Sequence, residues 1–175
     1  MKIVLMDRDG TLIAPPKDRR VDTPEKIKLF PDTLEALKLL ADNDYKIIVV
    51  TNQSGIAEGR FNENDYMKIN DHFIQMLAPS GIEVLKVYTC PHRRADNCDC
   101  RKPKPALILQ AASEFGLDLK DCFMVGDRQD DIDIAKNAGC RSILVKTGDF
   151  PVVGNDVTYI AEKLLESARY IVDYY

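Results

Sequence analysis

The sequence predicts a doubly wound parallel sheet of the α/β class. Apolar runs of strand length recur along the chain, and amphipathic stretches of helical period lie between them. Strands that alternate with helices in this way are typical of parallel sheets with helices packed on their faces. The length of 175 residues and the hydrophobic fraction of 45% fit a single domain, residues 1–175, with a real core.

The predicted strands are short and apolar, and each is followed at once by a polar residue or a glycine. A short continuous apolar run that ends in this way predicts a strand buried within a sheet. The five predicted strands are Lys2–Met6, Lys46–Val50, Val84–Tyr88, Cys122–Val125 and Ser142–Val145.

The predicted helices carry apolar residues three or four positions apart, so each presents one apolar face. Pro103 and Pro105 open the third helix, and Gly116 and Gly139 close the third and the fourth. The stretch Ile160–Val172 is expected to form the last helix. The apolar positions of the first four are Leu34, Ala36, Leu37 and Leu40; Tyr66, Ile69, Phe73 and Met76; Leu107, Ile108, Ala111 and Phe115; and Ile132, Ala135 and Ala138.

Two long irregular segments, Leu12–Phe30 and Thr89–Pro103, interrupt this alternation. Irregular segments of this length in a compact domain are usually functional or disordered. Ligands of doubly wound sheets bind outside the carboxyl ends of the strands, where the polar clusters of this chain also fall. We therefore expect a site at that edge of the sheet, with the two long segments beside it.

The charge balance argues against nucleic acid and anionic membranes as partners, because the formal net charge is −4. No apolar segment approaches the length of a membrane span. The apolar run before Asp7 is too short for the core of a signal peptide. We expect a cytoplasmic protein, with a monomer as the default state.

Asp7 and Asp9 follow the first predicted strand, in the segment Asp7-Arg8-Asp9-Gly10-Thr11. If the extended backbone continues past the strand, both carboxylates project the same way, and Gly10 then allows a sharp turn. Two carboxylates held together need a cation between them or a proton on one of them. The pair favours Mg²⁺-assisted transfer to a carboxylate nucleophile, and a surface turn is the alternative.

A polar cluster follows the second predicted strand and contains Thr51, Asn52, Gln53 and Ser54. Its hydroxyl, amide and backbone N–H groups suit the binding of phosphate oxygens ahead of a helix. The alternative is a set of helix-capping residues, because Ser and Asn cap helices in many proteins.

A third cluster, Gly126-Asp127-Arg128-Gln129-Asp130-Asp131, follows the fourth predicted strand. We assign Asp127 to Mg²⁺, a hard cation that takes few protein carboxylates along with water and phosphate. Asp130 and Asp131 either touch the metal or only cap the next helix.

Arg101 and Lys102 bring cations to a site otherwise rich in carboxylates. A lysine here can balance the charge of the nucleophile and of a transferring phosphoryl group. An arginine can hold a second phosphate through two hydrogen bonds, and Arg128 can act in the same way. The alternative is a solvated basic dipeptide.

Cys90, His92, Cys98 and Cys100 place four metal-ligand side chains within eleven residues. Three thiolates and an imidazole form a closed tetrahedral zinc set without an open position, so the site is expected to be structural. The zinc loop, at about residues 89–103, leads directly into Arg101 and Lys102. His72, the other histidine, is assigned to a helix surface.

The motifs Asp7-x-Asp9-Gly10-Thr11, Thr51, Lys102 and Gly126-Asp127-x-x-x-Asp131 occur in the order seen in the haloacid dehalogenase superfamily of phosphatases. The resemblance covers roughly residues 3–146. It implies a Rossmann-like haloacid dehalogenase fold. Only about twenty residues separate the first motif from the first predicted helix, so no large cap domain is expected.

This resemblance also implies roles for individual residues. Asp7 would attack phosphorus to form an aspartyl-phosphate, and Asp9 would act as general acid and then as general base. Asp7, the backbone carbonyl of Asp9 and Asp127 would hold Mg²⁺. The residues expected to stabilise the transferring group are Thr51 and Lys102, and those expected to line the substrate side are Asn52, Gln53, Ser54, Arg101 and Arg128.

The cysteine–histidine loop resembles a zinc-containing subgroup of this superfamily. Its members are the D-glycero-D-manno-heptose 1,7-bisphosphate 7-phosphatases and the histidinol-phosphate phosphatases. The segments Thr51–Gly59 and Thr147-Gly148 are similar to the heptose enzymes, and Pro15-Pro16 and Cys90–Lys104 are similar to the histidinol enzymes. A small phosphorylated substrate is expected, with the heptose bisphosphate favoured because it needs cations beyond the reacting centre.

Two interpretations without turnover are the alternatives. A phospho-accepting receiver domain also combines aspartates, a Thr, a Lys and Mg²⁺, but its phospho-accepting aspartate follows an interior strand rather than the first. A zinc-pinned binding domain would need no general acid, and Asp9 argues against it.

Overall fold

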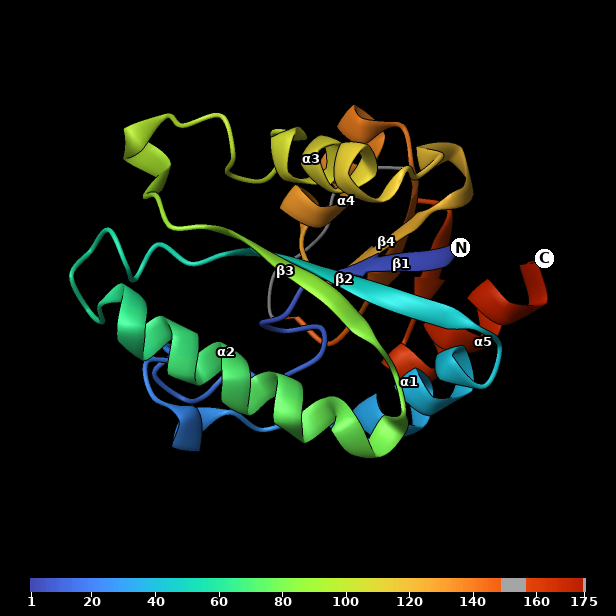
Figure 1. Ribbon diagram of the computed structural model, residues 1–175, viewed down its shortest axis with the longest axis horizontal. Helices are drawn as coiled ribbons and strands as arrows, with labels where there is room; N and C mark the ends of the chain where they lie inside the picture. The colour runs from blue at the N-terminus through green and yellow to red at the C-terminus, as the bar shows by residue number, and fades with distance from the viewer. Residues whose placement is uncertain (149–156, 175) are drawn as a thin grey trace.

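The computed structural model describes residues 1–148 and 157–174, which form a six-stranded parallel sheet in the order β3-β2-β1-β4-β5-β6 (Figure 1). The strands are β1 (Lys2–Met6), β2 (Tyr45–Asn52), β3 (Val84–Cys90), β4 (Phe123–Gly126), β5 (Arg141–Val145) and β6 (Tyr159–Ala161). The helices are α1 (Thr33–Ala41), α2 (Glu63–Leu77), α3 (Ala106–Phe115), α4 (Gln129–Ala138) and α5 (Leu164–Tyr174). The predicted doubly wound α/β class is confirmed.

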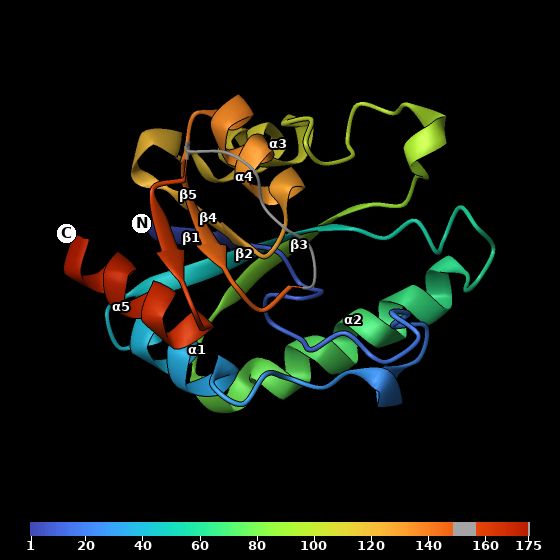
Figure 2. The same ribbon diagram turned by 180° about the vertical axis from the view of Figure 1, so that it is seen from behind.

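Helices cover both faces of the sheet: α3 and α4 lie on one face, and α1, α2 and α5 lie on the other (Figures 1 and 2). Alternating residues of β1 explain how one strand serves both layers, because successive side chains of a strand point to opposite faces. Val4 and Met6 belong to the core under α1, α2 and α5. Ile3 and Leu5 belong to the core under α3 and α4.

The end of the chain differs from its prediction as one helix, Ile160–Val172. Tyr159–Ala161 instead form β6, which pairs in parallel with β5 so that Ile143 lies opposite Tyr159. The final helix begins only at Leu164. The apolar spacing predicted the helix correctly from Leu164 onward. It could not predict β6, because a three-residue edge strand depends on pairing with a distant strand and has no local periodicity.

The segment between β1 and α1 is ordered and contributes to the core, although it is largely irregular. Leu12, Ile13 and Ile27 are buried, and Ile13 forms isolated bridges to Asp9 and Leu29. A short 3-10 helix at Pro24–Lys26 lies in the same segment. No large cap domain is present in residues 1–148 and 157–174, as expected. Among these residues, no helix combines the length and apolar character needed to cross a membrane.

Candidate active site

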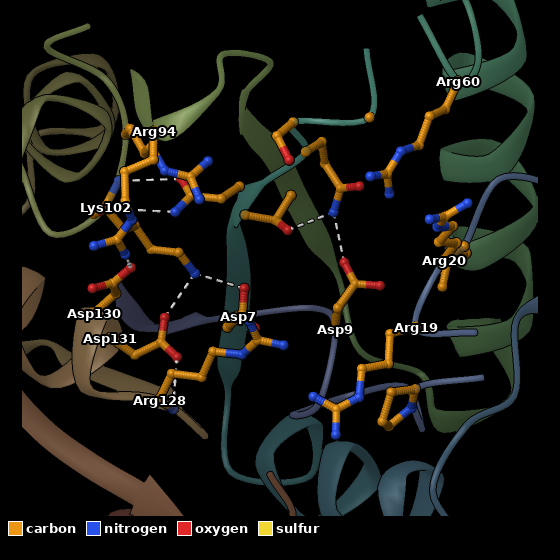
Figure 3. Close-up of a pocket in the computed structure, with 18 of the residues that line it drawn as sticks. Asp7, Asp9, Arg19, Arg20, Arg60, Arg94, Lys102, Arg128, Asp130 and Asp131 are labelled. Carbon is orange, nitrogen blue, oxygen red and sulfur yellow. Dashed lines mark hydrogen bonds and ion pairs between the residues drawn. The ribbon is translucent and has the colours of Figure 1, made fainter. Parts of the chain in front are cut away.

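The carboxyl ends of β1, β2 and β4 meet at one edge of the sheet, because β1 lies between β2 and β4. Asp7 directly follows β1, Thr51 lies at the end of β2, and Asp127 directly follows β4. A cavity of about 260 Å³ opens there (Figure 3). Its lining residues include Asp7, Asp9, Thr51, Asn52, Gln53, Ser54, Arg101, Lys102 and Arg128. Three sequence segments far apart in the chain therefore share one site.

A tight turn after β1 brings Gly10 and Thr11 against Asp127. Gly10 has a φ of +97°, and a Cβ atom there would lie 2.4 Å from Asp127 Oδ2. Only glycine fits both the left-handed backbone and this close approach. The Thr11 hydroxyl donates a hydrogen bond to Asp127 Oδ1 at 3.3 Å.

Lys102 is the central cation of the site. Its Nζ donates to Asp7 Oδ1 at 2.6 Å, to Asp131 Oδ1 at 2.7 Å and to the Val50 carbonyl at 2.9 Å. The side chain is 4% exposed. Burial alone would lower the pKa of Lys102, but Asp131 and Asp7 raise it above its usual value, so the ammonium stays charged.

The carboxylates of Asp7, Asp127 and Asp131 form a cluster whose negative charge exceeds the single positive charge of Lys102. Burial raises the pKa of Asp7 to about 8; Lys102 opposes this shift, and the neighbouring aspartates add to it. Burial and Asp131 raise the pKa of Asp127 to about 6. Oxygen atoms of Asp7, Asp127 and Asp131 lie within 4.8 Å of one another. A hard divalent cation fits this oxygen-rich cluster.

The structure separates the roles of Asp130 and Asp131, which the sequence left open. Asp131 Oδ2 accepts the backbone N–H of Arg128 at 3.1 Å and so caps α4, while Oδ1 binds Lys102. Asp130 pairs with Arg94 at 2.8 Å. Both oxygens of Asp131 are therefore engaged by protein groups, and the sequence analysis did not foresee its contact with Lys102.

Asp9 is held from two sides. The Arg8 guanidinium donates to it from Nε at 3.0 Å and from Nη2 at 3.3 Å. Gln53 Nε2 donates to Asp9 Oδ2 at 2.6 Å and to the Thr51 hydroxyl at 2.8 Å. Gln53 thus links Asp9 with Thr51.

Asn52 connects β2 with the loop that ends at Lys102. Its side-chain oxygen accepts the Lys102 backbone N–H at 3.1 Å, and its amide nitrogen donates to the Lys102 carbonyl at 3.4 Å. Arg101 donates from Nη1 to the His92 carbonyl at 3.0 Å, and its buried Nε has no hydrogen-bond partner in the described structure. Arg101, a residue of the pocket lining, thus has one buried donor without a partner among the described residues.

Four arginines of the pocket were not foreseen: Arg19, Arg20, Arg60 and Arg94. The close-up shows Arg19, Arg20 and Arg60 on the Asp9 side, with Arg94, Arg128 and Lys102 on the opposite side (Figure 3). A single arginine in a loop carries no periodic signal, so the sequence offered only the Arg19-Arg20 dipeptide inside a long irregular segment as a hint.

The cysteine–histidine cluster forms as expected. Cys90 and Cys100 each lie 3.6 Å from Cys98, measured between sulfur atoms. His92 Nδ1 lies 3.8 Å from the Cys90 sulfur and 3.2 Å from the Cys100 sulfur. For metal–sulfur bonds of about 2.3 Å, the corners of a tetrahedron lie about 3.8 Å apart. The four side chains are therefore spaced as a four-coordinate metal set would be.

Comparisons with known proteins identify the family. A family model described as "HAD-hyrolase-like" matches residues 99–167. The D-glycero-beta-D-manno-heptose-1,7-bisphosphate 7-phosphatase of Pasteurella multocida is 34% identical over 97% of this chain and 96% of its own length. The chain belongs to the haloacid dehalogenase-like phosphatases. As a phosphatase of this family it is an enzyme, so the two interpretations without turnover are set aside.

Two further similarities connect the chain with a solved phosphatase structure and with a histidine-biosynthesis protein. A crystal structure of D,D-heptose 1,7-bisphosphate phosphatase from B. bronchiseptica, complexed with magnesium and phosphate, superposes with a TM-score of 0.89 over all of both chains, at 31% identity. The histidine biosynthesis bifunctional protein HisB of Blochmanniella floridana is 38% identical over 81% of this chain but only 40% of its own length. The chain is thus similar to heptose bisphosphate phosphatases over nearly their whole length and to less than half of a histidine-biosynthesis protein.

Proposed function

We propose that this phosphatase removes the 7-phosphate of D-glycero-D-manno-heptose 1,7-bisphosphate through an aspartyl-phosphate on Asp7. The observation that carries the proposal is the charge of the pocket. Six arginines and one lysine line the cavity against four aspartates among the described residues. Arg60 pairs with Glu58, and Arg128 Nε lies 3.6 Å from Asp127 Oδ2. The lining still carries a net positive charge, which a second anionic group of the substrate complements.

Every aspartate of the cavity lining already has a cationic partner. Lys102 pairs with Asp7 and Asp131, Arg8 with Asp9, and Arg94 with Asp130. Histidinol phosphate carries an ammonium group on its leaving alcohol, and this group would enter a pocket where the arginines repel it. A bisphosphate carries a dianion there instead, so charge complementarity favours the heptose.

The reaction has two steps, formation of the aspartyl-phosphate and its hydrolysis. An oxygen of Asp7 forms a bond to phosphorus while the ester P–O bond breaks, and the proton of the Asp9 carboxyl passes to the leaving oxygen. Asp9 then takes a proton from the water that attacks phosphorus. This attack breaks the bond between Asp7 and phosphorus and releases inorganic phosphate.

Asp7, the backbone carbonyl of Asp9 and Asp127 would hold Mg²⁺ in this mechanism. The cation would neutralise charge on the phosphoryl oxygens. Lys102 adds a fixed positive charge beside Asp7. The Thr51 hydroxyl supplies a hydrogen bond to the transferring phosphoryl group. Asn52 fixes the backbone of Lys102, so its part in substrate binding is mainly indirect.

Cys90, His92, Cys98 and Cys100 would hold a structural zinc ion. The ion would fix the loop at about residues 89–103 within a single phosphatase domain. That loop carries Arg101, which lines the cavity and has a buried Nε without a hydrogen-bond partner among the described residues, and Arg128 lies at the start of α4. These two arginines are our candidates for binding the phosphate that is not cleaved. The enzyme would act in the cytoplasm as a monomer.

The test is a parallel measurement of kcat/KM on heptose 1,7-bisphosphate, heptose 7-phosphate and histidinol phosphate. We expect the order bisphosphate, monophosphate, histidinol phosphate. A preference for histidinol phosphate would overturn the substrate assignment and leave the histidinol-phosphate phosphatase, which the HisB similarity supports, as the function.

A further inference from the structure

Arg8 is a charged side chain that the proposed mechanism leaves without a role. It lies between Asp7 and Asp9 in the chain and is 0% exposed. Arginine is rarely buried to this extent unless its charge is paired. The groups around Arg8 must therefore compensate its buried charge.

The Arg8 guanidinium is fixed by contacts from Asp9 and from helix α2. Its Nε and Nη2 atoms grip the two oxygens of Asp9 at 3.0 and 3.3 Å, and Nη1 donates to Asn70 Oδ1 on α2 at 3.3 Å. The guanidinium carbon lies 5.8 Å from the centre of the Tyr66 ring, also on α2. The Tyr66 hydroxyl shares a hydrogen bond of 2.6 Å with Thr89 Oγ1 on β3.

This arrangement determines the orientation of Asp9. A two-pronged pair fixes both the position and the rotation of a carboxylate plane, which a single hydrogen bond does not. The backbone turn at Arg8 depends on other contacts, because its carbonyl accepts the N–H groups of Leu12 and Ile13 at 3.0 Å. The Arg8 carbonyl therefore stabilises the turn, and the Arg8 side chain separately binds Asp9.

We propose that Arg8 is a positioning residue that holds the Asp9 carboxyl in one orientation for both of its proton transfers. The proposal rests on the proposed function, in which Asp9 protonates the leaving oxygen as the ester P–O bond breaks. Helix α2 acts as the frame, because Asn70 and Tyr66 fix the guanidinium that fixes Asp9. Arg8 itself touches neither substrate nor phosphorus.

The test compares two substrates, one whose leaving group needs a proton and one whose leaving group does not. A defect in proton transfer affects only the first, whereas general damage to the site affects both. Arg8→Lys keeps the charge but loses the fork, so kcat on a sugar phosphate should fall by about 10²-fold, the lower range for general acid catalysis. On nitrophenyl phosphate, whose leaving group needs no proton, kcat should change by less than about threefold, because general acid catalysis contributes little there. Asn70→Ala removes one support of the guanidinium but leaves its fork to Asp9, so it should show the same selective loss on the sugar phosphate to a smaller degree.

A double-substitution cycle with Asp9→Asn provides the second measurement. If Arg8 acts through Asp9, Arg8→Lys should add almost no further loss on the sugar phosphate once Asp9 is Asn. Suppose that Arg8→Lys lowers kcat equally on both substrates while Asp9→Asn lowers it mainly on the sugar phosphate. This result would overturn the role of Arg8 and leave the general-acid role of Asp9 intact. Equal losses for Asp9→Asn itself would overturn the general-acid assignment and the proposal with it. Arg8→Gln, checked by thermal unfolding, replaces Arg8→Lys if the lysine variant does not fold.

Discussion

At the scale of single residues, the site combines a buried carboxylate, the proposed nucleophile Asp7, with a buried cation, Lys102. Asp7 and Lys102 lie 2.6 Å apart, and Asp131 shares the same ammonium. Lys102 therefore keeps a partner if Asp7 is neutralised, whereas removal of Lys102 leaves two carboxylates unpaired in a poorly solvated environment, which is costly. Substitutions here should therefore affect stability and turnover in different, separable ways.

Asp7→Asn should abolish turnover while the protein stays folded. The amide cannot form the acyl-phosphate, and losses of at least about 10³-fold are usual for groups that act as a unit. Its thermal midpoint without Mg²⁺ should equal or exceed that of the wild type, because one of several crowded carboxylates is gone and Asp131 still pairs with Lys102. Steady-state kinetics and thermal unfolding check both parts. Retention of more than about a tenth of wild-type kcat would exclude Asp7 as the nucleophile.

Arg101→Ala and Lys102→Ala should have contrasting effects. Loss of Arg101 should mainly raise KM for the bisphosphate and reduce its preference over a monophosphate, by roughly 2–5 kcal/mol if the phosphate is left unpaired. Loss of Lys102 should lower kcat on every substrate, because it acts on the transferring group. The measurement is kcat and KM on heptose bisphosphate, histidinol phosphate and an aryl phosphate. A uniform effect of Arg101→Ala on all three would show that Arg101 does not select the substrate.

At the scale of elements, the loop between β3 and α3 connects the cysteine cluster to the active site. Cys90 ends β3, and its carbonyl accepts the Gln53 N–H at 2.7 Å. Asn52 then pairs with the backbone of Lys102 at the far end of the loop. The loop is thus tied to β2 at both ends, and the four metal-type side chains hold its middle.

Zinc removal should therefore affect the active site as well as the loop. We expect one zinc per chain by elemental analysis, and Cys98→Ala or Cys100→Ala should lower zinc content, thermal stability and kcat together, because metal binding is coupled to folding of its loop. Cys140→Ala is the matched control, because Cys140 is partly buried but outside the cluster. Zinc-free wild-type protein with full activity, purified without chelators, would contradict this expectation.

At the scale of the whole molecule, the crowded carboxylates connect fold stability to pH and to Mg²⁺. Unfolded Asp7 and Asp127 ionise near their ordinary pKa of 3.8, whereas in the folded protein their pKa values are raised to about 8 and about 6. Between these limits the folded state holds more protons than the unfolded state. The stability of the metal-free protein should therefore fall as pH rises from about 5 to about 8.

Added Mg²⁺ should oppose this loss, and its effect should grow with pH. The cation competes with protons for the same carboxylates, so its stabilisation is larger at pH 8 than at pH 5.5. Thermal unfolding with and without added Mg²⁺ across this range is the measurement. Asp127→Asn should show a smaller Mg²⁺ shift. A shift that is the same at every pH would mean that Mg²⁺ binds elsewhere.

Much of the architecture followed from local patterns. The apolar runs predicted five of the six strands found in residues 1–148 and 157–174, because a parallel strand buried on both faces is apolar on both faces. Gly116 and Gly139 marked two helix ends correctly, since each adopts the left-handed conformation at a C-cap. The short strand β6 escaped prediction because its only signal is its pairing with β5.

By itself, the sequence determined the class of fold, the aspartate motifs and the four-residue cysteine–histidine set, because each is written in spacing along the chain. Only the tertiary structure decided which charges meet. The pair between Asp131 and Lys102, the burial of Arg8 and the arginines at positions 19, 20, 60 and 94 depend on contacts between distant segments. Such contacts leave no period in the sequence, since they arise where the folded sheet brings its strand ends and loops together.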